Sequence, residues 1–229
     1  EEWLTAKRGL KVTIRIPQKG LKEKLVELAA RNAQLVLSQD KEKIKREEGR
    51  TIGAVKEIEQ LLGMKDLNRM EAYDISNING FETVGSMIVY EKGRPKRSDY
   101  RKFKLRTVSG PDDYASMKEV VRRRYQRAIE ENSPLPDLII TDGGKGQMEV
   151  VREVIEDELH LNIPIAGLAK DNKHRTSELL FGFPAQTIGI KQQSSLFRLL
   201  TQIQDEVHRF AITFHRDKRS KRQVASALD

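Results

Sequence analysis

The fold is decided by one stretch of the sequence, Leu135-Pro136-Asp137-Leu138-Ile139-Ile140-Thr141-Asp142-Gly143-Gly144-Lys145-Gly146-Gln147. Its short apolar run after two prolines predicts a buried strand that ends at Asp142. Three glycines then allow a tight turn and a close approach of another group, and a helical apolar pattern begins at Met148. Strand, acid, glycine turn and helix place a carboxylate at the carboxyl edge of a sheet, where α/β folds bind ligands.

Three other interpretations of this stretch compete with a ligand site. Asp142 could simply cap the helix that follows it. A dinucleotide-binding fingerprint fails because Glu149 stands where a third glycine is required, and a phosphate-binding loop fails because Gly146, not Ser or Thr, follows Lys145. The stretch therefore presents a carboxylate that can be approached closely, with Lys145 beside it.

Composition favours a polyanionic partner. The chain has 229 residues, a net charge of +8 and a pI near 9.6, which points first to nucleic acid, with a merely basic protein as the alternative. The absence of cysteine excludes disulfides and Cys-ligated zinc. There is no apolar run of membrane-spanning length and no signal peptide, so we expect a cytoplasmic protein without membrane contact.

The first 65 residues are predicted to form an extension, or connector, packed on the main domain. Alternation predicts a strand over residues 11–16. A helical pattern follows over 21–48, Gly49 is predicted to end it, and a second helix over 51–62 is predicted to end at Gly63.

Residues 66–229 are predicted to form the main domain. The patterns predict five strands, over residues 70–76, 81–90, 99–106, 138–140 and 163–169. Helices are expected from about 109 to 130, after Gly146, and over 194–222, with an irregular hairpin over 181–190. The expected order along the chain is three antiparallel strands, then helix, strand, helix, strand and helix. This order predicts a mixed five-stranded sheet flanked by helices. This is the element order of the ribonuclease H-like fold, an α/β fold that sets an Asp on its first strand beside another at the end of its fourth. Asp74 and Asp142 occupy those places.

Two carboxylates on neighbouring strands repel each other unless a cation lies between them. Oxygen ligands suit a hard divalent ion such as Mg²⁺ or Mn²⁺, which can polarise a phosphodiester and orient an attacking water. The last helix offers a third ligand or base among Asp205, Glu206 and His208. The competing interpretation of His208 is a hydrogen-bonded residue at a helix interface.

At this point the sequence resembles the UvrC family, the endonuclease subunit of bacterial nucleotide excision repair. The resemblance rests on Met70-Glu71-Ala72-Tyr73-Asp74-Ile75-Ser76, on the stretch from Leu138 to Gln147, and on Asp205-Glu206-Val207-His208-Arg209-Phe210-Ala211. It implies a C-terminal ribonuclease H-like domain that cuts the damaged strand on the 5′ side of a lesion with a bound divalent metal. The family's metal-binding and catalytic positions fall on Asp74, Asp142 and His208. A further catalytic Asp falls on Asp113, although Asp112 or Asp113 could instead cap the helix.

The resemblance also predicts partners and fragment boundaries. It implies damaged double-stranded DNA and UvrB as partners, the latter bound through a segment missing here. The family's N-terminal nuclease domain and C-terminal helix-hairpin-helix motifs are not visible, so we expect an excised catalytic region. DNA contact would then fall to basic residues of this domain, namely Lys145, Lys170, Arg209, Arg216 and Arg219. For any one of them a solvated surface charge is the alternative, but as a set they favour a strip that follows phosphates.

Two other functions stay open at the level of sequence. One is another ribonuclease H-like nuclease, such as an integrase or a junction resolvase. The other is a metal-free nucleic-acid-binding module that keeps the fold. Titration with Mn²⁺ separates a metal enzyme from a binding module, and a panel of nucleic-acid substrates separates the nucleases.

Overall fold

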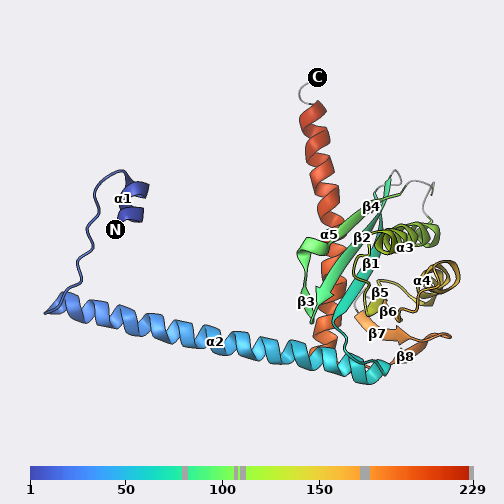
Figure 1. The fold of residues 1–229 in the computed structure, drawn as a ribbon, viewed down its shortest axis with the longest axis horizontal. Coiled ribbons are helices and arrows are strands. Elements are labelled where there is room, and N and C mark those ends of the chain that lie inside the picture. Colours follow the sequence, from blue (N-terminus) through green and yellow to red (C-terminus); the bar gives the residue numbers. More distant parts are fainter. Residues whose placement is uncertain (79–81, 106–107, 109–111, 171–175, 227–229) are drawn as a thin grey trace. The chain divides into compact units, whose positions relative to one another are not determined.

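The structure, a computed structural model, describes residues 1–78, 82–105, 108, 112–170 and 176–226, with the side chains of the last helix described as far as Ile212. It divides into two compact units, residues 1–49 and 50–229 (Figure 1). The boundary expected after residue 65 stays a prediction. Within the described residues, no helix is long and apolar enough to cross a membrane.

The first unit corrects two predictions. It contains α1 (Glu2–Arg8) and most of α2 (Leu21–Leu62). Residues 11–16 are not a strand: the amides of Val12 and Ile14 donate to the side chains of Thr5 and Glu1 instead of to another strand. Ile14 and Ile16 are exposed, so the alternation that suggested a strand has no core to face.

The predicted break at Gly49 is also wrong, because α2 runs through it without interruption. One glycine inside a helix costs only about 1 kcal/mol relative to alanine, an amount that good helix formers on both sides can offset. The helix does end at Gly63, as predicted, where the backbone takes a positive φ of 64°. In the second unit, Ala54, Ile58 and Leu62 of α2 are buried in the core.

The second unit is built on one mixed sheet. Its strands are β1 (Arg69–Ile78), β2 (Glu82–Glu91), β3 (Arg94–Pro95), β4 (Arg101–Lys104), β5 (Leu138–Thr141), β6 (Ile165–Lys170), β7 (Thr176–Phe181) and β8 (Gln186–Ile188). They lie in the order β3-β2-β1-β5-β6-β7-β8, and β4 also pairs with β2. The five predicted strands are present as β1, β2, β4, β5 and β6. Three further strands, β3, β7 and β8, enlarge the sheet.

Helices cover both faces of the sheet. On one face lie α3 (Asp113–Glu130) and α4 (Lys145–Arg152), which continues as a π-helical segment, Glu153–Glu158. On the other lies α5 (Ser195–Ser226), which contacts β1 and β2 (Figure 1). Side chains alternate between the faces of a strand, so Tyr73 meets Tyr125 of α3 while its neighbour Asp74 faces α5.

A buried carboxylate anchors α3 to the sheet. Glu71 of β1 is fully buried and meets the guanidinium groups of Arg69 and Arg124 at 3.1 and 2.8 Å. The hydroxyls of Tyr73 and Tyr125 donate to its other oxygen. Burial raises the pKa of both tyrosines well above the usual value, so they remain neutral donors. Because every side of Glu71 is compensated, its charge fixes α3 in place instead of destabilising the core.

Gly85 gives a direct test of this packing. A Cβ at Gly85 would overlap Cγ2 of Val120 on α3 and lie 3.1 Å from Cγ1. We expect Gly85→Ala to lower the free energy of unfolding by about 1–3 kcal/mol, the usual cost of overpacking. The matched control is Gly189→Ala, because a Cβ there meets nothing within 4 Å. Urea denaturation of both variants checks this, and equal stabilities would contradict the tight contact of α3 with β2.

Candidate active site

Two aspartates lie side by side at the carboxyl edge of parallel strands. Tyr73 of β1 pairs with Thr141 of β5, and the amide of Asp142 donates to the carbonyl of Tyr73 at 2.9 Å. Asp74 and Asp142 are the next residues on these strands, and neighbouring strands lie about 4.8 Å apart. Both side chains face α5 and both residues are only 8% exposed. Asp74 and Asp142 are therefore neighbours, as predicted from the sequence, and both buried carboxylates lie on the face of the sheet that α5 covers.

One helix supplies a partner to each carboxylate. Gln204 and His208 are one turn apart on α5, so they share a face of that helix. The buried amide of Gln204 donates to Oδ1 of Asp142. Nδ1 of His208 lies 3.7 Å from Oδ2 of Asp74, and the histidine side chain is 59% exposed. His208 therefore stands at the rim of a pair that is otherwise covered.

The sequence did not single out Gln204. An amide inside a helix has no signal of its own, but its spacing of four from His208 on the inward face could have indicated it. The sequence analysis also missed Ser86, a second polar residue beside the aspartates. Ser86 of β2 pairs with Asp74 of β1 and is fully buried. Within the part of the chain that the structure describes, its hydroxyl has no hydrogen-bond partner.

The glycines after Asp142 serve different purposes. A Cβ at Gly146 would lie 2.6 Å from the hydroxyl of Tyr114, and one at Gly143 would overlap the side-chain amide of Gln147. At Gly144 a Cβ would meet nothing within 4 Å. The turn is therefore glycine-rich mainly so that its own neighbours can pack, and Gly144 is the residue that faces open space.

The remaining predicted residues are placed as follows. Asp112 caps α3 by accepting from the amide of Ala115 at 2.9 Å, and Asp113 is the exposed first residue of the helix. Lys145 is the exposed first residue of α4. The side chains of Lys170, Arg216 and Arg219 lie outside the described residues.

Glu206 of α5 is held by Arg209 on the same helix and by Tyr100, the residue before β4. Arg209 donates to both oxygens of Glu206, at 2.6 and 2.8 Å, and the hydroxyl of Tyr100 donates to the same carboxylate. The hydrogen bond from Arg209 holds the pKa of Glu206 below its usual range. Glu206 is therefore occupied by Arg209 and Tyr100, and Arg209 is in turn engaged with Glu206.

Among the described residues, no group of three or more His, Asp or Glu is arranged to hold a metal ion. Mg²⁺ is commonly held by one or two carboxylates, with waters and substrate phosphates filling its other positions. The donor set of Asp74 and Asp142 fits that mode of binding. It does not form a cage made of protein ligands alone.

Known families match most of the chain. The family described as "UvrC RNAse H endonuclease domain" matches residues 59–212, and "UvrC Ribonuclease H-like domain" matches residues 1–40. UvrABC system protein C of Bacteroides thetaiotaomicron is 69% identical over 222 residues, covering 95% of this chain and 36% of that protein. The chain belongs to the UvrC family. The match confirms the predicted ribonuclease H-like fold and the resemblance seen in the sequence.

More distant relatives extend the comparison. UvrABC system protein C of Bacteroides fragilis is 66% identical over 95% of this chain and 36% of that protein. The protein of the same name from Lachnospira eligens is 54% identical over the whole chain and 38% of its own length. This UvrC chain thus spans little more than a third of the length of these relatives. The solved structure of human ENDOV covers 68% of this chain and 86% of its own at 11% identity, with a TM-score of 0.38; this likeness carries no functional argument.

The lowered pKa of Glu206 predicts a pH dependence of stability. A carboxylate whose folded-state pKa is depressed stabilises the fold above its unfolded pKa, near 4.5, and this stabilisation is lost as pH falls through the folded-state pKa. We expect the stability difference between the wild type and Glu206→Gln to be largest above about pH 5.5 and to shrink steadily below pH 4.5. Chemical denaturation from pH 3.5 to 7 measures it, and a difference that does not change with pH would contradict the assignment.

Proposed function

We propose that this UvrC chain is a divalent-metal-dependent DNA endonuclease that makes the 5′ incision at lesions during nucleotide excision repair. The observation that supports it most is the adjacent, same-face placement of Asp74 and Asp142 on parallel strands. The names of the family and of its relatives, which refer to an endonuclease domain and to the UvrABC system, support the same function. Under this proposal the substrate is damaged double-stranded DNA and the partner is UvrB.

Asp74 and Asp142 would hold Mg²⁺ or Mn²⁺, with His208 at the open rim. When bound, such an ion supplies positive charge that polarises a phosphodiester and makes a bound water more acidic. Gln204 fixes the orientation of the Asp142 carboxylate through its amide. His208 is exposed and close to Asp74, so it can complete the site as a ligand or orient and deprotonate the attacking water.

The DNA backbone would be held by charges around this rim. Lys145 is exposed at the first turn of α4, directly after the glycine turn that follows Asp142. Lys170, Arg209, Arg216 and Arg219 remain proposed contacts, and Arg209 would first have to exchange Glu206 for a phosphate. Contacts of this kind position DNA without reading its sequence, which suits an enzyme that accepts lesions in any context.

Replacing either aspartate should abolish incision without unfolding the protein. Asp74→Asn and Asp142→Asn keep the size of the side chain and remove the repulsion between the two charges. We expect 5′ incision of a lesion-containing duplex, measured with UvrB and the full-length protein, to fall by about three orders of magnitude, because metal catalysis supplies several kcal/mol. Isothermal titration of this chain with Mn²⁺ should show that uptake is lost in parallel.

The matched control is Glu130→Gln, an exposed residue at the end of α3 that changes the charge by the same amount. It should leave incision, Mn²⁺ uptake and melting temperature unchanged. Normal cutting by Asp74→Asn would overturn the assignment of the site. Absence of any carboxylate-dependent Mn²⁺ uptake by the wild-type chain would favour a metal-free binding module instead.

A further inference from the structure

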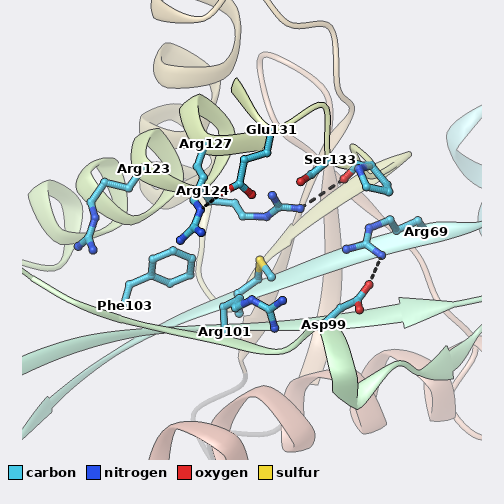
Figure 2. A pocket seen from close by; sticks show the side chains of 11 residues that line it. Arg69, Asp99, Arg101, Phe103, Arg123, Arg124, Arg127, Glu131 and Ser133 are labelled. Carbon is cyan, nitrogen blue, oxygen red and sulfur yellow. Dashed lines mark hydrogen bonds and ion pairs between the residues drawn. The ribbon is translucent and has the colours of Figure 1, made fainter. Parts of the chain in front are cut away.

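A basic cavity lies on the opposite face of the sheet from the two aspartates. A cavity of about 280 Å³ opens where α3 meets β1, β2 and β4. Figure 2 shows side chains of α3 facing those of the sheet across it. Two carboxylates, Asp99 and Glu131, line it together with five arginines, namely Arg69, Arg101, Arg123, Arg124 and Arg127.

Two of these arginines form fixed walls. Arg69 is held between Glu71 and Asp99, at 3.1 and 2.7 Å. Arg123 donates to the carbonyl of Lys104 and to Glu119, and its guanidinium lies 5.9 Å from the ring of Phe103. These ion pairs already satisfy the two charges, so Arg69 and Arg123 shape the cavity without being its main ligand donors.

The other three arginines keep donors for a ligand. Arg124 is 11% exposed and its Nη2 donates to Glu71 and Pro134, but among the described residues its buried Nε has no hydrogen-bond partner. Arg101 is exposed and donates only to the carbonyls of Ser98 and Tyr100 in the described part of the chain. Arg127 pairs with Glu131 where the side chains are 74% and 50% exposed, and such a surface pair is weak enough to be exchanged for a ligand.

We propose that this arginine cavity binds a backbone phosphate of a nucleic-acid strand. A buried donor without a partner is unfavourable, and a phosphate oxygen that accepts from Arg124 Nε would remove that penalty. A tetrahedral phosphate can present oxygens to the arginines of α3 and to those of the sheet at once. The planar carboxylate of an acidic peptide can pair well with only one guanidinium group. Half-buried Phe103 offers an apolar face for the adjoining sugar or base.

The cavity would position a strand and take no part in cutting it. Gly85 and Phe103 pair across β2 and β4 and face α3, whereas Ser86 and Lys102 in the next row face α5 together with Asp74. The sheet therefore separates the cavity from the aspartate pair. The choice of nucleic acid as ligand rests on the proposed function. DNA binding measured without metal distinguishes a failure of the cavity proposal from a failure of the nuclease proposal.

The test is DNA binding without metal, so that no cleavage occurs. The variant Arg101→Gln with Arg127→Gln removes two cavity charges and leaves Arg124, which compensates buried Glu71, in place. The control Arg46→Gln with Arg50→Gln removes the same charge from exposed positions on α2. Fluorescence anisotropy with a labelled 20-mer single strand at several salt concentrations measures affinity. We expect the cavity variant to bind at least about tenfold more weakly and its salt slope to drop by about one, with the control within about twofold of wild type.

Three outcomes would overturn the proposal. One is an equal loss in both double variants, which would leave only general charge attraction. Another is a glutamate-rich peptide that binds in a cavity-dependent way while DNA binding is unaffected. The third is competition by millimolar inorganic phosphate that is identical in wild type and cavity variant. If DNA binding does not depend on the cavity but incision still depends on Asp74, only the cavity proposal is wrong. If incision does not depend on Asp74 but DNA binding depends on the cavity, only the nuclease proposal is wrong.

Discussion

The structure depends on the parallel pairing of β1 with β5. That register brings Asp74 and Asp142 into one row on the same face of the sheet, so the backbone holds the two carboxylates next to each other. Like charges on neighbouring strands repel each other, and both residues are nearly buried, so solvent screens that repulsion little. A divalent cation held between the two carboxylates would relieve the repulsion, and this is the physical basis of the proposed metal site.

Buried carboxylates have different partners on the two faces of the sheet. Toward α3, Glu71 meets two arginines and two tyrosine hydroxyls, and this saturated network joins helix to sheet. Toward α5, Asp74 and Asp142 meet a partly exposed histidine and a neutral amide. A carboxylate surrounded by fixed cations stabilises a fold, whereas carboxylates with an accessible rim can exchange ligands. The functional site is therefore expected on the α5 face, and α3 serves stability and positioning.

Sequence patterns predicted the strands because these depend on local signals, whereas the pairing of Asp74 with Asp142 was predicted from the element order of the ribonuclease H-like fold. The apolar run before Asp142 and the strand ending near Asp74 follow from alternation and turn chemistry alone. The errors came where tertiary context decides: residues 11–16 alternate without a core to face, and Gly49 lies in a helix long enough to continue through it. Gln204 was missed because only the packing of α5 on the sheet shows that its amide reaches Asp142.

The most direct measurement is the anomalous scattering of Mn²⁺ in crystals of this chain. We expect one peak, or two close together, between the carboxylates of Asp74 and Asp142 and within reach of the exposed rim at His208. Crystals of Asp142→Asn treated in the same way should lose that density. Manganese bound elsewhere, or no density between the two carboxylates at saturating concentration, would contradict the central claim that this pair exists to hold a cation.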